Sequence, residues 1–290
     1  MISAATGRRM APWIFVVLWS TGFVAARYAT EDNGPLAFLT LRMIGAAVVL
    51  AIASRAIGRV RITRRQIATS AIAGVGINAL YLGGVFVAID QGMSSALSAL
   101  ISGLHPVVTA VLASLFFGEQ LRPRQWLGVG LGLAGVIWFT LSRTVGAETS
   151  LPTIALLAMA ASLAGMVGGT LVQRRFNSGV PLLAGTSSQY VASAGLLGVA
   201  ALTVERQPVV VTTTFSLAII YAIVVLSVGA ILLMLWLLQQ GAAAHVSSLF
   251  FLAPGLSAIE AAVLFSERID APSVAALALS ALGVVFVMRT

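Results

Sequence analysis

Ionisable side chains inside apolar runs are the first candidates for chemistry in this sequence. Glu260 lies in the middle of the apolar run 242–265, six residues after Pro254. An ionisable group inside a membrane is costly, and it usually marks a functional site. A carboxyl group there could bind a substrate ammonium group or carry a proton, or it could stay protonated and bond to a neighbouring helix. The sequence leaves these interpretations open.

One arginine and two histidines also lie within apolar runs. Arg42, in the run 35–56, could pair with a substrate carboxylate, bond to helix-end carbonyls or extend its charge towards the interface, and the structural interpretations are favoured. His105 and His245 could sense pH, although packing histidines are favoured at both positions. The polar or coupling candidates are therefore Arg42, His105 and Glu260.

Neutral polar residues complete the predicted substrate site. Asn78 and Tyr81 are three residues apart, so they share a helix face and offer an amide and a phenol to a cavity. Bonding between helices is the structural alternative. The predicted substrate-cavity residues are Trp19, Asn78, Tyr81, Ser98, His245, Ser248 and Glu260.

Two prolines are candidates for a gate. Pro106 and Pro254 each remove a backbone donor within an apolar run and can kink a helix there. The bend, or the carbonyl groups that it frees, could form part of a pocket and gate.

Signatures of enzymes and bound cofactors are missing from the sequence. Cysteine is absent, and there is no HExxH motif, close Asp pair or plausible Ser-His-Asp set. GVGLGLAG at 128–135 lies inside an apolar run without a preceding strand, so it is not a nucleotide-binding loop. We therefore expect no metal and no cofactor, and we do not expect an enzyme.

Composition places these residues in a membrane protein. Of 290 residues, 59% are apolar and 9% are charged, whereas a soluble domain carries roughly 25% charged residues. The net charge of +8 comes from 17 basic residues, all of them Arg, which lie mostly between apolar runs. That distribution is typical of topology signals and argues against nucleic-acid binding.

The apolar runs predict ten membrane-spanning helices. A spanning helix needs about 20 mostly apolar residues, and helices satisfy all their backbone groups within lipid. The runs are too long and continuous for barrel strands. The predicted spans are 12–29, 35–56, 67–88, 94–117, 125–142, 151–171, 181–203, 215–238, 242–265 and 272–288.

Arginine positions predict that both termini are cytoplasmic. With that orientation, twelve Arg residues lie in cytoplasmic segments and three lie in the opposite loops. Single cysteines introduced at Ser3 and Thr290 should therefore resist impermeant thiol reagents added to intact cells and react after permeabilisation. Labelling of either cysteine in intact cells would contradict this topology.

The sequence repeats at an offset of 148 residues. LHPVVTAVLASLFFGEQL (104–121) matches LAPGLSAIEAAVLFSERI (252–269), which aligns Pro106 with Pro254 and Glu119 with Glu267. The repeat divides the chain into halves 1–146 and 147–290 with five spans each. Because five is an odd number, the halves should be inverted in the membrane, as in many secondary transporters.

These segments resemble a known family. LFFGEQL followed by LGVGLGLAGVIWF, and again VLFSERI followed by LALSALGVVFV, resemble the EamA-type module of the drug/metabolite transporter superfamily. WSTGFVAARYA, FLTLRMIGA and NALYLGGVFVAIDQG fit the first spans of that module, whereas MAASLAGMVGG lacks the Trp that is common at the start of the second half. The resemblance implies a ten-helix inner-membrane carrier, often an exporter, and overall similarity is greatest to bacterial aromatic amino acid exporters.

The sequence thus predicts a bacterial inner-membrane exporter of small organic metabolites. Neutral amino acids are the favoured substrates, moved by alternating access around a central, mainly apolar cavity. An exporter of drugs or other metabolites with the same fold, and a membrane-embedded enzyme, are the alternatives. The expected partners are a small-molecule substrate, protons and the lipid bilayer, without nucleic acid or an obligate protein partner.

Overall fold

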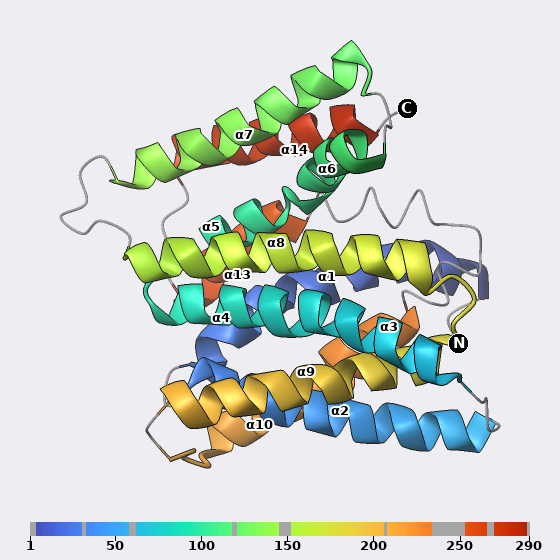
Figure 1. The fold of residues 1–290 in the computed structure, drawn as a ribbon. Coiled ribbons are helices and arrows are strands. Elements are labelled where there is room, and N and C mark those ends of the chain that lie inside the picture. Colours follow the sequence, from blue (N-terminus) through green and yellow to red (C-terminus); the bar gives the residue numbers. More distant parts are fainter. Residues whose placement is uncertain are drawn as a thin grey trace. The chain divides into compact units, whose positions relative to one another are not determined.

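The described part of the chain is helical. The computed structural model describes residues 4–30, 33–57, 62–117, 121–144, 152–205, 208–233, 253–265 and 270–288. Within these ranges the chain forms helices and no strand (Figure 1), which confirms the predicted all-α class. Seven helical stretches in the described ranges are long and apolar enough to cross a membrane, and Gly255–Phe265 and Ala271–Phe286 are shorter apolar helices.

The helices agree closely with the predicted spans. For example, the spans predicted at 35–56 and 181–203 are helices Pro35–Ile57 and Leu182–Val204. The span predicted at 242–265 is described only from residue 253. The described elements are α1 (Ala4–Ala29), α2 (Pro35–Ile57), α3 (Arg64–Gly74), η1 (Val75–Leu80), α4 (Tyr81–Asp90), α5 (Ser95–Ser102), α6 (His105–Phe117), α7 (Pro123–Thr144), α8 (Thr153–Phe176), α9 (Leu182–Val204), α10 (Thr213–Tyr221), η2 (Ala222–Gly229), α13 (Ala253–Phe265) and α14 (Ala271–Met288).

The span predicted at 94–117 is interrupted. α5 ends at Ser102 and α6 begins at His105, so the chain leaves the helix at Gly103 and Leu104. Pro106 lies in the first turn of α6. Backbone N–H groups in a first turn have no acceptor within the helix, so a proline, which lacks this group, is tolerated there. The proline predicted to kink this span therefore lies just after a break in it.

Two segments of π-helix are embedded in the third and eighth spans. η1 joins α3 to α4 without interruption, and η2 continues α10. A π-helix widens the backbone turn, which changes the direction of the side chains within it, and such segments are frequent at functional sites. Val75 and Ala222, the first residues of η1 and η2, are 147 residues apart, close to the repeat offset of 148.

One compact unit comprises Ala25–Gln91 and Thr153–Gly229. In it α2 packs along α9, and η1 and α4 pack along α8 (Figure 1). The η1–α8 contact requires glycine, since a Cβ atom added at Gly76 would lie 2.6 Å from the carbonyl oxygen of Gly165. Close approach at small residues is a common way for membrane helices to associate.

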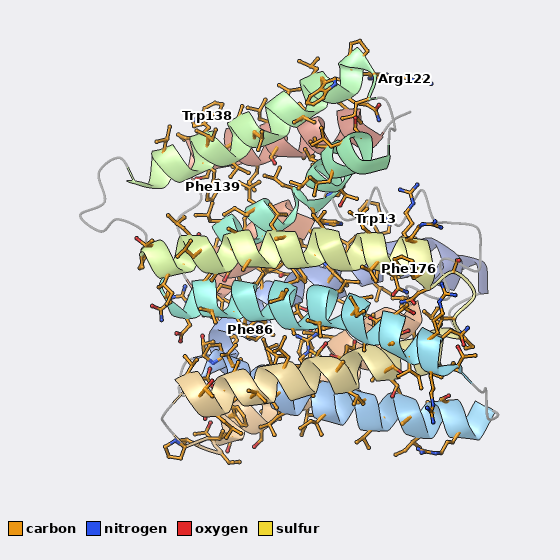
Figure 2. The ribbon with its side chains drawn as sticks, viewed as in Figure 1. Trp13, Phe86, Arg122, Trp138, Phe139 and Phe176 are labelled. Atoms are coloured by element: carbon orange, nitrogen blue, oxygen red, sulfur yellow. The ribbon has the colours of Figure 1, made fainter. Side chains whose placement is uncertain are left out.

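The other compact unit comprises Met1–Val24, Gly92–Pro152 and Ala230–Thr290. Here α7 packs along α14, and α5 contacts α13. Trp138 and Phe139 are neighbours on α7 (Figure 2), but Trp138 is 45% exposed and Phe139 only 1%. α7 thus has apolar side chains both on its buried face and on its exposed face.

Each compact unit combines segments from both predicted halves, 1–146 and 147–290. The unit that begins at Ala25 contains the spans predicted second, third, sixth and seventh and most of the eighth, and the other contains described parts of the remaining spans. The inverted orientation of the two halves stays a prediction.

Candidate functional site

The predicted site residues are divided between the two units. The unit with α1 holds Trp19, Ser98, His105, Pro106, Pro254 and Glu260, and the unit with α2 holds Arg42, Asn78 and Tyr81. His245 and Ser248 lie outside the described residues. The hydrogen bonds given below for Glu260, Arg42 and Asn78 each join residues of one unit.

Glu260 bonds to the middle of α1. The hydroxyl of Ser20, which is fully buried, lies 2.6 Å from Glu260 Oε1. Glu260 Oε2 is also buried, and no described residue gives it a hydrogen bond. A buried polar atom without a partner is costly. This oxygen is therefore suited to take up a proton or to form a hydrogen bond with a bound molecule.

The geometry around Ser20 suits a protonated carboxyl group. Ser20 Oγ also lies 2.9 Å from the carbonyl oxygen of Val17, yet a hydroxyl group has only one hydrogen to donate. If Glu260 carries a proton, its carboxyl group can donate to Ser20 while Ser20 donates to Val17. If Glu260 is ionised, Ser20 must divide one hydrogen between two acceptors.

Besides that of Ser273 on α14, three more hydroxyl groups in this unit are buried without a described partner. They belong to Ser98 and Ser102 on α5 and to Ser257 on α13. Ser98 and Ser102 are four residues apart, and Ser257 is three residues before Glu260, so each pair shares a helix face. Because α5 and α13 pack together, the unit holds several polar groups that are free to bond a polar solute.

The other predicted residues of this unit have local contacts. His105 begins α6, and its Nδ1 lies 3.2 Å from the carbonyl oxygen of Ser102, across the break before the helix. Trp19 packs against Phe15, with ring centroids 5.8 Å apart. Pro254 is the second residue of α13, as Pro106 is of α6. Their roles in gating and substrate binding stay predictions.

Arg42 makes an interhelical contact in the other unit. Its side chain is buried on α2, and Nε donates to Ser227 Oγ of η2 at 2.8 Å. The hydroxyl of Tyr190 on α9 donates to the carbonyl oxygen of Ser227 at 3.1 Å. α2, α9 and η2 are thereby joined at one residue, Ser227.

Asn78 begins a chain of amide hydrogen bonds. From η1 its Nδ2 donates to Gln189 Oε1 on α9 at 3.5 Å, a long contact, and Gln189 Nε2 donates to Gln173 Oε1 on α8 at 3.0 Å. Asn177 Nδ2 also donates to Gln173 Oε1, at 2.8 Å. Tyr81 is buried one turn after Asn78, and its carbonyl oxygen accepts from Ser162 at 2.9 Å.

Sequence reasoning missed Tyr190, Gln189 and Ser227. The repeat carried a usable signal for two of them, because Gln189 and Tyr190 lie 147 and 148 residues after Arg42. Ser227 lies 149 residues after Asn78, but its residue type does not mark it, since a serine in a membrane helix commonly bonds only to its own helix. Among the described residues no cluster of three or more His, Asp or Glu side chains could hold a metal ion.

Comparison with known proteins places the chain among membrane transporters. The sequence model of the EamA-like transporter family matches residues 12–141 and 152–289. The uncharacterized inner membrane transporter YedA of Escherichia coli K12 is 23% identical over 269 residues, which cover 93% of this chain and 85% of the relative. The same protein from strain CFT073 matches equally well.

A solved structure has the same fold. It is described only as the crystal structure of a protein, and it matches with a TM-score of 0.70 at 21% sequence identity, covering 98% of both chains.

Proposed function

The chain belongs to the EamA-like transporter family, and from this premise we propose that it exports neutral amino acids, aromatic ones included, in exchange for protons. It is a multi-pass transporter of the inner membrane. The proposal adds a substrate class, alternating access around a central cavity, and a proton carried by Glu260.

The half-buried Glu260, with its buried Oε2 atom, is the observation that carries the proposal. It lies within an apolar helix, it meets Ser20 in a geometry that suits the protonated form, and its second oxygen has no described partner. A group of this kind can exchange a proton, or a substrate ammonium group, in step with a conformational change. Either event would couple the transport of an amino acid to the proton gradient.

The scarcity of charge supports a neutral solute. A phosphorylated sugar is a dianion and would need several Arg or Lys residues within the membrane. Arg42 is the only buried arginine among the residues that the structure describes. Buried hydroxyl groups such as those of Ser98 and Ser257 can instead orient a small polar group whose side chain occupies apolar surroundings.

Flux through the purified protein tests the substrate. Liposomes containing only this protein should accumulate radiolabelled phenylalanine when loaded with unlabelled phenylalanine, and empty liposomes should not. Transport of phosphorylated sugars without any amino acid flux would refute the proposal. Transport of structurally unrelated drugs in place of amino acids would favour a multidrug exporter.

Replacing Glu260 tests the coupling. An imposed pH gradient should change the phenylalanine flux of the wild-type protein several-fold, because proton movement drives the cycle, and Glu260→Gln should remove this response. Asp90→Asn is the matched control, since Asp90 is exposed at the end of α4 and its carboxylate accepts from the amide of the adjacent Gln91. If the folded Gln variant keeps the wild-type pH response, Glu260 does not carry the coupled proton and its role is structural.

A further inference from the structure

Arg42 is a buried cation without an anionic partner in the described structure. Only 7% of its surface is exposed, and as the eighth residue of α2 it lies about 10 Å along the helix from its first residue. The described acids of its unit are engaged elsewhere: Glu205 accepts from the backbone of Leu36 and Ala37, and Asp90 accepts from Gln91. A buried charge normally has a counterion, because desolvation without one is costly.

The guanidinium group is held by one edge only. Nε donates to Ser227, and no described residue accepts a hydrogen bond from either Nη atom. A guanidinium group has five N–H donors in a planar fork, so four remain for a ligand. That edge matches the two oxygens of a carboxylate, which arginine binds in bidentate fashion.

The orientation of the fork is fixed by a second bond. Tyr190 is almost fully buried on α9 and donates to the carbonyl oxygen of Ser227, which ties the backbone of η2 at this residue to α9. The π-helical turn of η2 determines where Ser227 points. The free edge of Arg42 is thus preorganised, which lowers the entropy lost when an anion binds.

The matching contact in the repeat shows that the charge is not needed for packing. Asn78 and Ser227 are 149 residues apart, and each lies in the π-helical segment of its half. Asn78 contacts Gln189, which is 147 residues after Arg42, just as Ser227 contacts Arg42. Both contacts join the third span of one half to the second span of the other, but the first uses neutral amides. A cation at only one of the two equivalent places indicates a role beyond holding helices together.

We infer that Arg42 binds the carboxylate of the transported solute and that Ser227 positions its guanidinium group. The inference rests on the proposed function in taking an amino acid as the solute. It adds that the solute is recognised through its carboxylate, by the unit that contains α2. Glu260, in the other unit, has the separate role of exchanging a proton.

Substrates with and without a carboxylate test the inference in liposomes. Arg42→Gln should raise the phenylalanine concentration needed for half-maximal flux at least about tenfold, since a charge-assisted hydrogen bond is lost. The same variant should change the flux of phenylalaninamide, which has no carboxylate, less than about twofold. Ser227→Ala should show a smaller loss in the same direction, and Arg64→Gln, at an exposed arginine, should show none.

Folding and ligand binding are checked separately. Arg42→Gln introduces a glutamine, which is the residue type at Gln189, the counterpart of Arg42 in the repeat. The variant should therefore fold, and its melting temperature in detergent without ligand should stay close to that of wild type. In the same assay 3-phenylpropionate should raise the melting temperature of wild type and not that of Arg42→Gln. This arm stays informative if phenylalanine proves not to be a substrate, in which case only the proposed function fails.

Three results would overturn the inference. One is an equal loss of phenylalanine and phenylalaninamide flux in Arg42→Gln, and another is no stabilisation of wild type by any carboxylate. The third is stabilisation of wild type by phosphatidylglycerol in phosphatidylcholine vesicles, lost in Arg42→Gln, without any effect of carboxylates. That result would assign Arg42 to a lipid headgroup.

Discussion

Replacing Gly135 with alanine is expected to destabilise the protein by about 1–3 kcal/mol, the usual cost of overpacking a filled interior. A Cβ atom at this position would lie 2.6 Å from the backbone nitrogen of Ser280 and 2.7 Å from the carbonyl oxygen of Ala276 on α14. These atoms belong to a helix backbone and cannot move aside as a flexible side chain can. α7 and α14 must therefore separate, which weakens packing along much of both helices.

Gly130 supplies the control for this prediction. It lies on the same helix, and a Cβ atom added there would meet no atom within 4 Å. Gly130→Ala should leave the melting temperature in detergent unchanged or raise it slightly, because alanine favours a helix over glycine. Equal melting temperatures for the two alanine variants would show that α7 and α14 do not pack as closely as described.

Replacing Glu205 with alanine is expected to release the start of α2 and to cost about 3 kcal/mol, because two hydrogen bonds to a charged acceptor are lost and each contributes about 1.5 kcal/mol at this partly exposed site. The carboxylate at the end of α9 accepts from the backbone nitrogens of Leu36 at 2.7 Å and Ala37 at 2.9 Å. These N–H groups have no partner within their own helix, and a negative charge suits a helix N-terminus. Gly34 permits this approach, because a Cβ atom there would collide with the same carboxyl group.

The charge and the hydrogen bonds can be separated at this position. Glu205→Gln keeps an acceptor oxygen and should retain part of the contribution that these two hydrogen bonds make to the free energy of unfolding. Glu205→Ala should lose the whole of that contribution. Asp90→Ala is the control, because Asp90 bonds only to its neighbour Gln91 on an exposed surface. The readout is thermal unfolding in detergent, and a loss no larger for Glu205→Ala than for Asp90→Ala would contradict the prediction.

The helices and their approximate ends follow from the sequence. An apolar run of about 20 residues must be helical in lipid, because no other single segment satisfies its own backbone there. This local rule gave 35–56 for α2, observed at Pro35–Ile57, and 215–238 for the stretch that begins with α10 at Thr213. It could not show the break at Gly103 or the π-helical turns, since both lie within continuous apolar runs and leave hydropathy unchanged.

The sequence also marks the two buried or half-buried charged residues, Glu260 and Arg42, because a charge in an apolar run is conspicuous. Their surroundings came only from the tertiary structure: Ser20 is 240 residues from Glu260, and Ser227 is 185 residues from Arg42. Hydropathy indicates that a helix lies in lipid, but it does not indicate which helices pack against each other. Neighbours depend on the fit of small residues such as Gly76 against Gly165, and that fit exists only once the helices are packed.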